Sequence, residues 1–150
     1  YAPLDITGTI TNTATVSGAQ LASPLTASHT LSTTAAPNLS IVKGICPAQV
    51  AENGRITYTF GLQNYGNTAT SDTDRVQITD TFSPLLSNLS VSYNGTVLPE
   101  TSYSYDATTG VFSTNPGIIN IPAATYVQNP TTGAYTLTPG TATVTVTGNI

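Results

Sequence analysis

Charged side chains are scarce in this sequence of 150 residues, where three basic and seven acidic groups leave a formal net charge of -4. Clustered Lys and Arg side chains neutralise phosphates in nucleic-acid-binding proteins and bind anionic headgroups at membrane surfaces. Neither a nucleic-acid partner nor a polybasic membrane anchor is therefore expected. No apolar run approaches the roughly 20 residues of a membrane-spanning helix, so we expect no membrane insertion.

Residues that support catalysis or metal binding are equally rare. Cys46 is the only cysteine and His29 the only histidine, which excludes an intrachain disulfide and a metal site built on paired histidines. There is no glycine-rich phosphate loop, and no serine or cysteine has an evident basic partner. Asp72 and Asp74 have the chemistry of calcium ligands, but a solvated loop is the favoured interpretation. We expect no enzyme activity, no metal and no cofactor.

The sequence has instead a strict alternation of apolar and hydroxyl residues. In residues 6–18, ITGTITNTATVSG, every odd position is Thr or Ser, whereas the even positions include Ile6, Ile10, Ala14 and Val16. This period of two predicts a strand, over 5–18, with one face in a core and one in water. Further strands are predicted over 24–34, 38–45, 54–64, 75–82, 88–93, 96–98, 101–105, 110–113, 118–121, 124–128, 134–137 and 141–150.

Turn residues separate these strands, as in Asn94-Gly95, and no segment has the periodicity of a helix. Many short strands with frequent turns predict an all-β fold, an immunoglobulin-like β-sandwich. The segment Ala-Ala-Pro-Asn at 35–38 marks a boundary. It divides an N-terminal strand or hairpin extension with its linker, 1–37, from a sandwich domain, 38–150. Two strands alone are marginally stable in water, so the extension must pack on something else.

Four sequence elements follow this boundary: Leu-x-Ile-x-Lys at 39–43, Gly-x-Ile-Thr-Tyr-Thr-Phe at 54–60, Asn-Tyr-Gly-Asn at 64–67 and Ile-Thr-Asp-Thr-Phe at 78–82. With them, residues 38–150 resemble the conserved repeat domain of bacterial and archaeal surface proteins, a family of unknown function. The resemblance implies an immunoglobulin-like fold and an extracellular location, on a cell or spore surface. Cys46 departs from the family pattern, which more often has a small hydroxyl residue there.

The order of two segments suggests how the extension is used. In tandem arrays of this family, a strand like TATVTVTGNI, here 141–150, is typically followed by one like GTITNTATVSG, here 8–18, so the order is rotated in this chain. The favoured explanation is that strand 5–18 is donated to a neighbouring sandwich. Its core contacts would be Ile6, Ile10, Ala14 and Val16. A circular permutation within one domain and a cut from a longer array are the alternatives.

Three polar residues, Asn12, Lys43 and Asp80, fall on the predicted core faces of separate strands. An isolated buried charge costs several kcal/mol, so we expect the three side chains to meet. One hypothesis is an isopeptide bond, which several families of surface-protein sandwiches form. In it the Lys43 amine attacks the Asn12 carboxamide, and Asp80 acts as the acid catalyst.

The alternative is a buried ion pair between Lys43 and Asp80, with Asn12 hydrogen-bonded to it. Asn64 is a second candidate for the isopeptide acceptor, although its Asn-Tyr-Gly-Asn context favours a turn. For the isopeptide hypothesis, Lys43→Ala is expected to be tolerated better in folding than Asp80→Ala, because it removes the buried charge itself, whereas Asp80→Ala leaves an unreacted lysine inside without its acid.

These observations predict a non-enzymatic structural subunit of an extracellular surface fibre, pilus- or appendage-like, that polymerises head to tail with copies of itself. The competing prediction is an adhesin or ligand-binding module of a tandem-repeat cell-surface protein, in which loops bind a host or matrix ligand of unknown identity. Five tyrosines suit either a binding patch or packing between sheets. They are Tyr93, Tyr103, Tyr105, Tyr126 and Tyr135.

Overall fold

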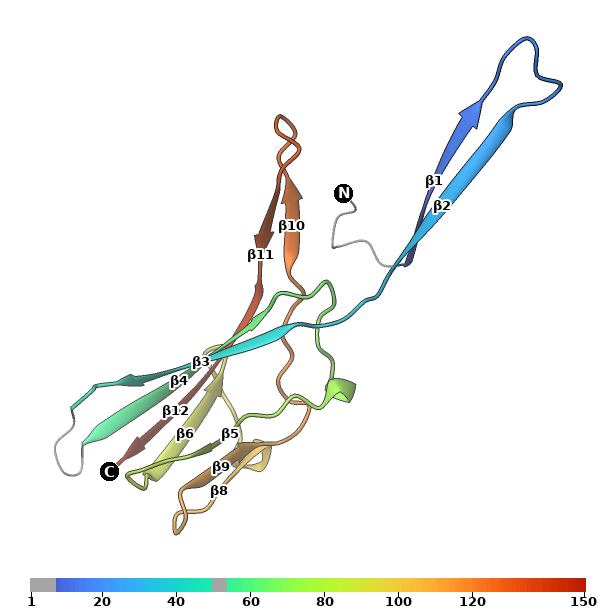
Figure 1. Cartoon of the computed structure of the whole chain (residues 1–150). Helices are drawn as coiled ribbons and strands as arrows, with labels where there is room; N and C mark the ends of the chain where they lie inside the picture. Colours follow the sequence, from blue (N-terminus) through green and yellow to red (C-terminus); the bar gives the residue numbers. More distant parts are fainter. Residues whose placement is uncertain (1–7, 50–53) are drawn as a thin grey trace.

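The computed structural model describes residues 8–49 and 54–150, and this part of the chain is nearly all β-structure (Figure 1). Two single-turn 3-10 helices, η1 (Asp72–Asp74) and η2 (Glu100–Ser102), interrupt the strands. The all-β class predicted from the alternation is thereby confirmed. The strands are β1 (Gly8–Val16), β2 (Leu25–Thr33), β3 (Leu39–Cys46), β4 (Arg55–Asn64), β5 (Thr79–Thr81), β6 (Ser87–Tyr93), β7 (Thr96–Val97), β8 (Tyr103–Tyr105), β9 (Val111–Thr114), β10 (Thr125–Gln128), β11 (Tyr135–Thr138) and β12 (Gly140–Asn149).

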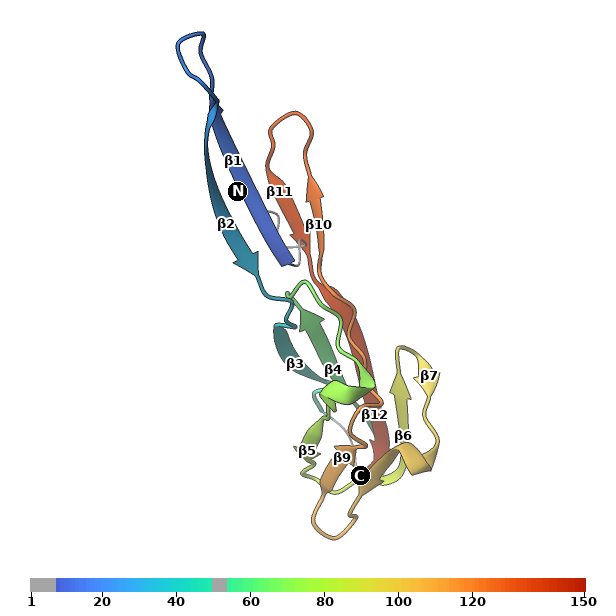
Figure 2. The same ribbon diagram turned by 90° about the vertical axis from the view of Figure 1, so that its right-hand side faces the viewer.

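Two antiparallel sheets form the body of the molecule. The larger has five strands in the order β3-β4-β12-β6-β7, and the smaller has three in the order β5-β9-β8. Figure 2 shows the smaller sheet lying against one face of the larger one. The sheets differ in width, so the strands at their edges are not matched one to one. This mismatch determines where the sandwich is open.

The core lies between the two sheets and follows from the alternation along β4 and β12. These strands pair along their whole length, so that Phe60 lies opposite Val144 and Tyr58 opposite Val146, while their threonines point outward. The smaller sheet contributes Phe112, which is fully buried. Burial of each such side chain stabilises the fold by about 1.5–3 kcal/mol. The buried apolar cluster comprises Ile56, Tyr58, Phe60, Leu62, Ile78, Phe82, Leu86, Val91, Phe112, Ile119, Ile121, Ala142, Val144 and Val146.

Two of the predicted strands differ from the structure. Residues 118–121 form no strand, although Ile119 and Ile121 are fully buried. Ile121 instead bonds to the loop residue Thr70, through its carbonyl and its N–H, at 3.0 and 2.7 Å. The strand predicted over 75–82 shrinks to Thr79–Thr81, because Arg75 takes a left-handed conformation (φ 52°) at the end of η1. An apolar run thus identified the core segment in both places, but not its backbone.

Two hairpins project from the same end of the sandwich (Figures 1 and 2). One is the N-terminal hairpin β1–β2, paired without interruption from Gly8 opposite Thr33 to Val16 opposite Leu25. The other is β10–β11, which continues from the sandwich through β12. The N-terminal extension predicted from the sequence is therefore a hairpin outside the sandwich.

Candidate functional site

An ion pair joins the edge strands of the two sheets. Lys43 on β3 and Asp80 on β5 approach to 2.5 Å between Nζ and Oδ2. The ammonium group also lies over three aromatic rings of the core, those of Tyr58, Phe60 and Phe82, at 5.0, 5.8 and 5.7 Å from the ring centroids. Each such contact attracts a cation through the quadrupole of the ring. Lys43 is thus held at a defined position between the sheets.

The carboxylate is the more buried member of the pair. The Asp80 side chain is 18% exposed and the Lys43 side chain 43%. Asp80 Oδ1 accepts a hydrogen bond from the Thr81 N–H at 2.9 Å, whereas the buried Oδ2 has no hydrogen-bond partner and depends on Lys43. The pair therefore lies at the mouth of the sandwich, where the Lys43 side chain is partly open to water and the Asp80 carboxylate is mostly buried.

A groove of about 330 Å³ opens beside the pair, between β3 and β5. The groove is lined by Lys43, Gly44, Ile45, Tyr58, Thr81 and Ser83. β5 is the edge strand of the smaller sheet, and within the described residues no strand pairs with its free side. The groove is therefore the open lateral seam of the sandwich.

The inner face of β3 is apolar and uncovered along this seam. Leu39, Ile41 and Ile45 share a face with Lys43 and lie opposite buried residues of β4, yet they are 44%, 55% and 50% exposed. Their neighbours across the strand pair, such as Leu62, are almost completely buried. The smaller sheet ends before it reaches β3, so the apolar face that should line a core lies in water.

A second uncovered apolar face, besides that of β3, lies on the hairpin β1–β2. The opposite face of the hairpin consists of hydroxyl residues only, from the Thr9–Ser32 pair to the Thr15–Thr26 pair. Val16 and Leu25 are each 62% exposed, and Leu31 is 52% exposed. The apolar face carries Ile10, Asn12, Ala14 and Val16 on β1 and Leu25, Ala27, His29 and Leu31 on β2. Of the predicted donor contacts, Ile10, Ala14 and Val16 lie on this face, and Ile6 lies outside the described residues.

The structure does not bring the three predicted crosslink residues together within one chain. Asn12 is exposed on the projecting hairpin, opposite His29, whereas Lys43 and Asp80 lie in the sandwich (Figure 1). Asn64, the second candidate acceptor, is fully buried in the predicted turn. Its Oδ1 accepts from the N–H groups of Asn38 and Gly66 and its Nδ2 donates to a carbonyl, so its amide holds the turn together. Lys43 lies opposite Phe60, four residues from Asn64 along β4.

The other candidates from the sequence have local roles. Asp74 caps η1 by accepting from the Ser71 N–H at 2.7 Å, and Asp72 accepts from the Asn120 side chain at 2.7 Å. Neither belongs to a group of potential metal ligands, and no such group occurs in the described ranges 8–49 and 54–150. Cys46 is exposed at the end of β3.

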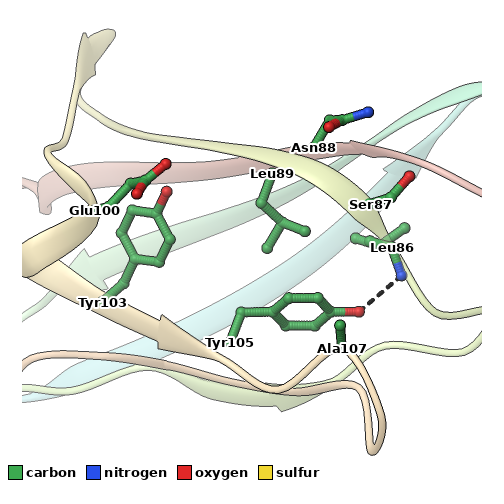
Figure 3. A pocket seen from close by; sticks show the side chains of 8 residues that line it. All are labelled: Leu86, Ser87, Asn88, Leu89, Glu100, Tyr103, Tyr105 and Ala107. Atoms are coloured by element: carbon green, nitrogen blue, oxygen red, sulfur yellow. Dashed lines mark hydrogen bonds between the residues drawn. The ribbon is translucent and has the colours of Figure 1, made fainter.

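A second groove, of about 530 Å³, lies at the opposite side of the sandwich, where β6 and β8 are neighbours (Figure 3). Leu89 points between the rings of Tyr103 and Tyr105, and the Tyr105 hydroxyl accepts from the Leu86 N–H at 2.7 Å. Burial, with the nearby charge of Glu100, raises the pKa of Tyr103 above its ordinary value. The sequence showed these tyrosines but not this groove, because nothing local indicates that β6 and β8 are neighbours.

Comparisons with protein families, with curated proteins and with solved structures found no match to this chain. Within the part of the chain that the structure describes, no helix is long and apolar enough to cross a membrane. The features of the molecule that bear on its function are therefore the two uncovered apolar faces and the Lys43–Asp80 pair.

Proposed function

We propose that the chain is the structural subunit of an extracellular fibre, in which the β1–β2 hairpin of one copy packs against the open seam of the next. The observation that carries this proposal is the presence of two uncovered apolar faces on one chain, the hairpin face and the inner face of β3. They cannot cover each other within one chain, because the hairpin points away from the sandwich (Figure 1). An isolated hairpin is marginally stable in water, so the hairpin needs a partner surface.

The seam offers a hairpin both backbone and side-chain partners. Placed beside the free edge of β5, a donated hairpin would extend the smaller sheet from three strands to five. The extended sheet would then match the five strands of the larger one and lie over the inner face of β3. Pairing with an exposed strand edge is a common mode of peptide recognition, in which backbone hydrogen bonds provide affinity and alternate side chains provide specificity.

Asn12 on the hairpin face and Lys43 on the inner face of β3 have apolar neighbours at the same spacing. Asn12 is flanked two positions away by Ile10 and Ala14, and Lys43 is flanked two positions away by Ile41 and Ile45. If Asn12 lies over Lys43, each of its apolar neighbours falls on an apolar neighbour of Lys43. Any shift by one residue would turn the hydroxyl face of the hairpin toward the core. This register supports contact between Asn12 of one copy and Lys43 of the next.

In that register the isopeptide bond becomes a bond between subunits. The Lys43 amine would attack the carboxamide carbon of Asn12, forming a new C–N bond, and the amide nitrogen would leave as ammonia. Asp80 lies beside the Lys43 nitrogen, where it can first take a proton from the ammonium group and so give the neutral amine that attacks. It can then pass this proton to the leaving nitrogen and accept the second proton that the new amide nitrogen loses. The product is an uncharged amide, and no oxidant or reductant is required.

The test uses substitutions on the two faces of β1. Ile10→Asp and Val16→Asp are expected to abolish fibres, because docking would bury a charge at a cost of several kcal/mol. Thr11→Asp, on the hydroxyl face of the same strand, is the matched control and should assemble normally. The measurement is negative-stain electron microscopy of the purified proteins. Uniform monomers of the wild-type chain, or fibres of both apolar-face variants, would contradict the proposal.

The alternative function is that of an adhesive or ligand-binding module. The observation in its favour is the groove between β6 and β8 (Figure 3), which combines two tyrosine rings with the Glu100 carboxylate. The predicted tyrosine patch is divided, since Tyr126 and Tyr135 lie on the β10–β11 hairpin. Monomers that show no self-association at any concentration would favour this alternative.

A further inference from the structure

The second projecting hairpin, β10–β11, also has two unlike faces. Tyr126 pairs with Leu137, and Gln128 pairs with Tyr135, so these four side chains share one face. Tyr135 and Leu137 remain 38% and 37% exposed. The opposite face carries three threonines and Val127, which is 65% exposed. A two-stranded ribbon with an aromatic and apolar face outside the core is again marginally stable by itself.

The linker of the N-terminal hairpin is fixed to the turn at residues 64–67, which we call the joint. The Tyr65 N–H donates to the Asn38 carbonyl at 2.8 Å, and the Ala36 N–H donates to the Asn67 side chain at 3.1 Å. The N-terminal hairpin therefore leaves the sandwich in a direction that the joint determines, and the linker is not a free tether.

The β10–β11 hairpin is fixed to the same joint. The Ala124 N–H donates to the Gly66 carbonyl at 2.9 Å, just before β10 begins. The Tyr126 hydroxyl donates to the Tyr65 carbonyl at 3.0 Å. Tyr126 belongs to the aromatic face, so this face is directed to the side of β10–β11 on which the joint and the linker lie.

From this arrangement we infer that β10–β11 is a second assembly arm, whose aromatic face contacts the same neighbouring copy that receives the β1–β2 hairpin. The inference rests on the proposed function, since it requires that a neighbour is bound. Both hairpins leave one joint toward the same end of the molecule (Figures 1 and 2). A neighbour that holds the first hairpin is therefore placed beside the second.

The tip of β10–β11 forms a turn whose residues bond to one another, and its sequence lacks the large apolar side chains that the arm itself presents. The Asn129 side chain accepts from the N–H groups of Thr131 and Thr132 at 2.9 and 3.1 Å, and the Gly133 N–H donates to the Asn129 carbonyl. The contact is assigned to the side chains of Tyr135 and Leu137, which lie along the arm.

The test compares the two faces of the arm. In the double variant Tyr135→Ser/Leu137→Ser, the critical concentration for fibre formation is expected to rise about tenfold or more, as for the loss of one interface anchor. Val127→Ser, on the opposite face, is the control and should stay within about twofold of wild type. The measurement is the soluble fraction after ultracentrifugation of a dilution series. Equal critical concentrations for wild type and the double variant would overturn the inference while leaving the proposed function intact.

A crosslinking experiment keeps the inference testable if the double variant folds poorly. The photoreactive residue p-benzoylphenylalanine replaces Tyr135 in otherwise wild-type fibres, and Val127 in the control. Irradiation is expected to give adducts between subunits at position 135, identified by peptide mass spectrometry, and far fewer at position 127. Adducts only within one chain would overturn the inference. Fibres that never form from the wild-type chain would instead refute the proposed function.

Discussion

At the scale of single residues, Asp80 depends on its ion-pair partner more than Lys43 does. The inner carboxylate oxygen of Asp80 is buried and has only Lys43 as a partner. The Lys43 side chain as a whole is the more exposed of the two, and its flexible stem allows the ammonium group to reach water when the carboxylate is removed. Removal of the lysine therefore leaves a buried charge without a partner, whereas removal of the aspartate leaves a charge that solvent can hydrate.

This asymmetry reverses the order expected from the sequence. Lys43→Ala is expected to lower the free energy of unfolding by about 1–3 kcal/mol, the cost of an unpaired buried polar group. Asp80→Ala should cost less, about 0–1 kcal/mol, because the Lys43 side chain that it leaves unpaired is 43% exposed and its charge can be hydrated. The measurement is urea denaturation of unassembled protein. Lys43→Met, which keeps the stem over the rings, is the control for packing, and wild-type stability of that variant would refute the role given to the charge.

At the scale of elements, the joint shows how a tight turn orients a whole hairpin. Gly66 has no side chain, and a Cβ atom built there would lie 2.2 Å from the Ala36 carbonyl oxygen and 2.6 Å from the Asn38 nitrogen. Only glycine lets the linker cross the turn this closely. The direction of the N-terminal hairpin thus depends on the absence of a side chain at Gly66 and on the buried Asn64 amide, which bonds to both the linker and the turn.

Gly66→Ala is therefore expected to displace the linker. The predicted loss is about 1–3 kcal/mol of stability, as in overpacked sites, together with faster proteolytic cleavage between residues 33 and 39. Gly61→Ala, in the adjacent strand, is the control, since its Cβ would have an ordinary contact of 3.9 Å with the Val42 carbonyl. Limited proteolysis followed by mass spectrometry measures the effect. Equal cleavage rates in the two variants would show that the joint does not hold the linker.

Much of the element list could be predicted because a period of two is a local signal. The alternation identified β4 and β12 almost to their ends, and it put Lys43 and Asp80 on core faces. It could not show that the smaller sheet leaves β3 uncovered, because the order of strands in a sheet depends on contacts between strands that are distant in the sequence. For the same reason, Asn12 was expected beside Lys43, whereas in one chain it lies opposite His29.

At the scale of the whole molecule, the proposed donor and acceptor surfaces are different patches at different places on one chain. The donor is the hairpin face beyond one end of the sandwich, and the acceptor is the lateral seam at β3 and β5 (Figure 1). An interface between unlike patches does not close on itself in a dimer, and repetition generates a ring or an open filament. An unfilled seam would expose an apolar edge that promotes aggregation, so the proposed fibre would also be the state in which the seam of every interior copy is covered.

An isopeptide bond between subunits would change the properties of the whole fibre. If Asn12 of one copy reacts with Lys43 of the next, the fibre becomes one covalent polymer. Boiling in detergent should then leave a ladder of multiples, and each bond should reduce the mass by one ammonia, with the joined Asn12 and Lys43 peptides detectable by mass spectrometry. Lys43→Arg separates the ion pair from the crosslink, because it keeps a positive charge for Asp80 but lacks the primary amine. Its fibres should form and dissolve to monomers. Wild-type fibres that dissolve completely, with the mass of the unmodified sequence, would exclude the bond and leave docking of the hairpin as the whole of the assembly mechanism.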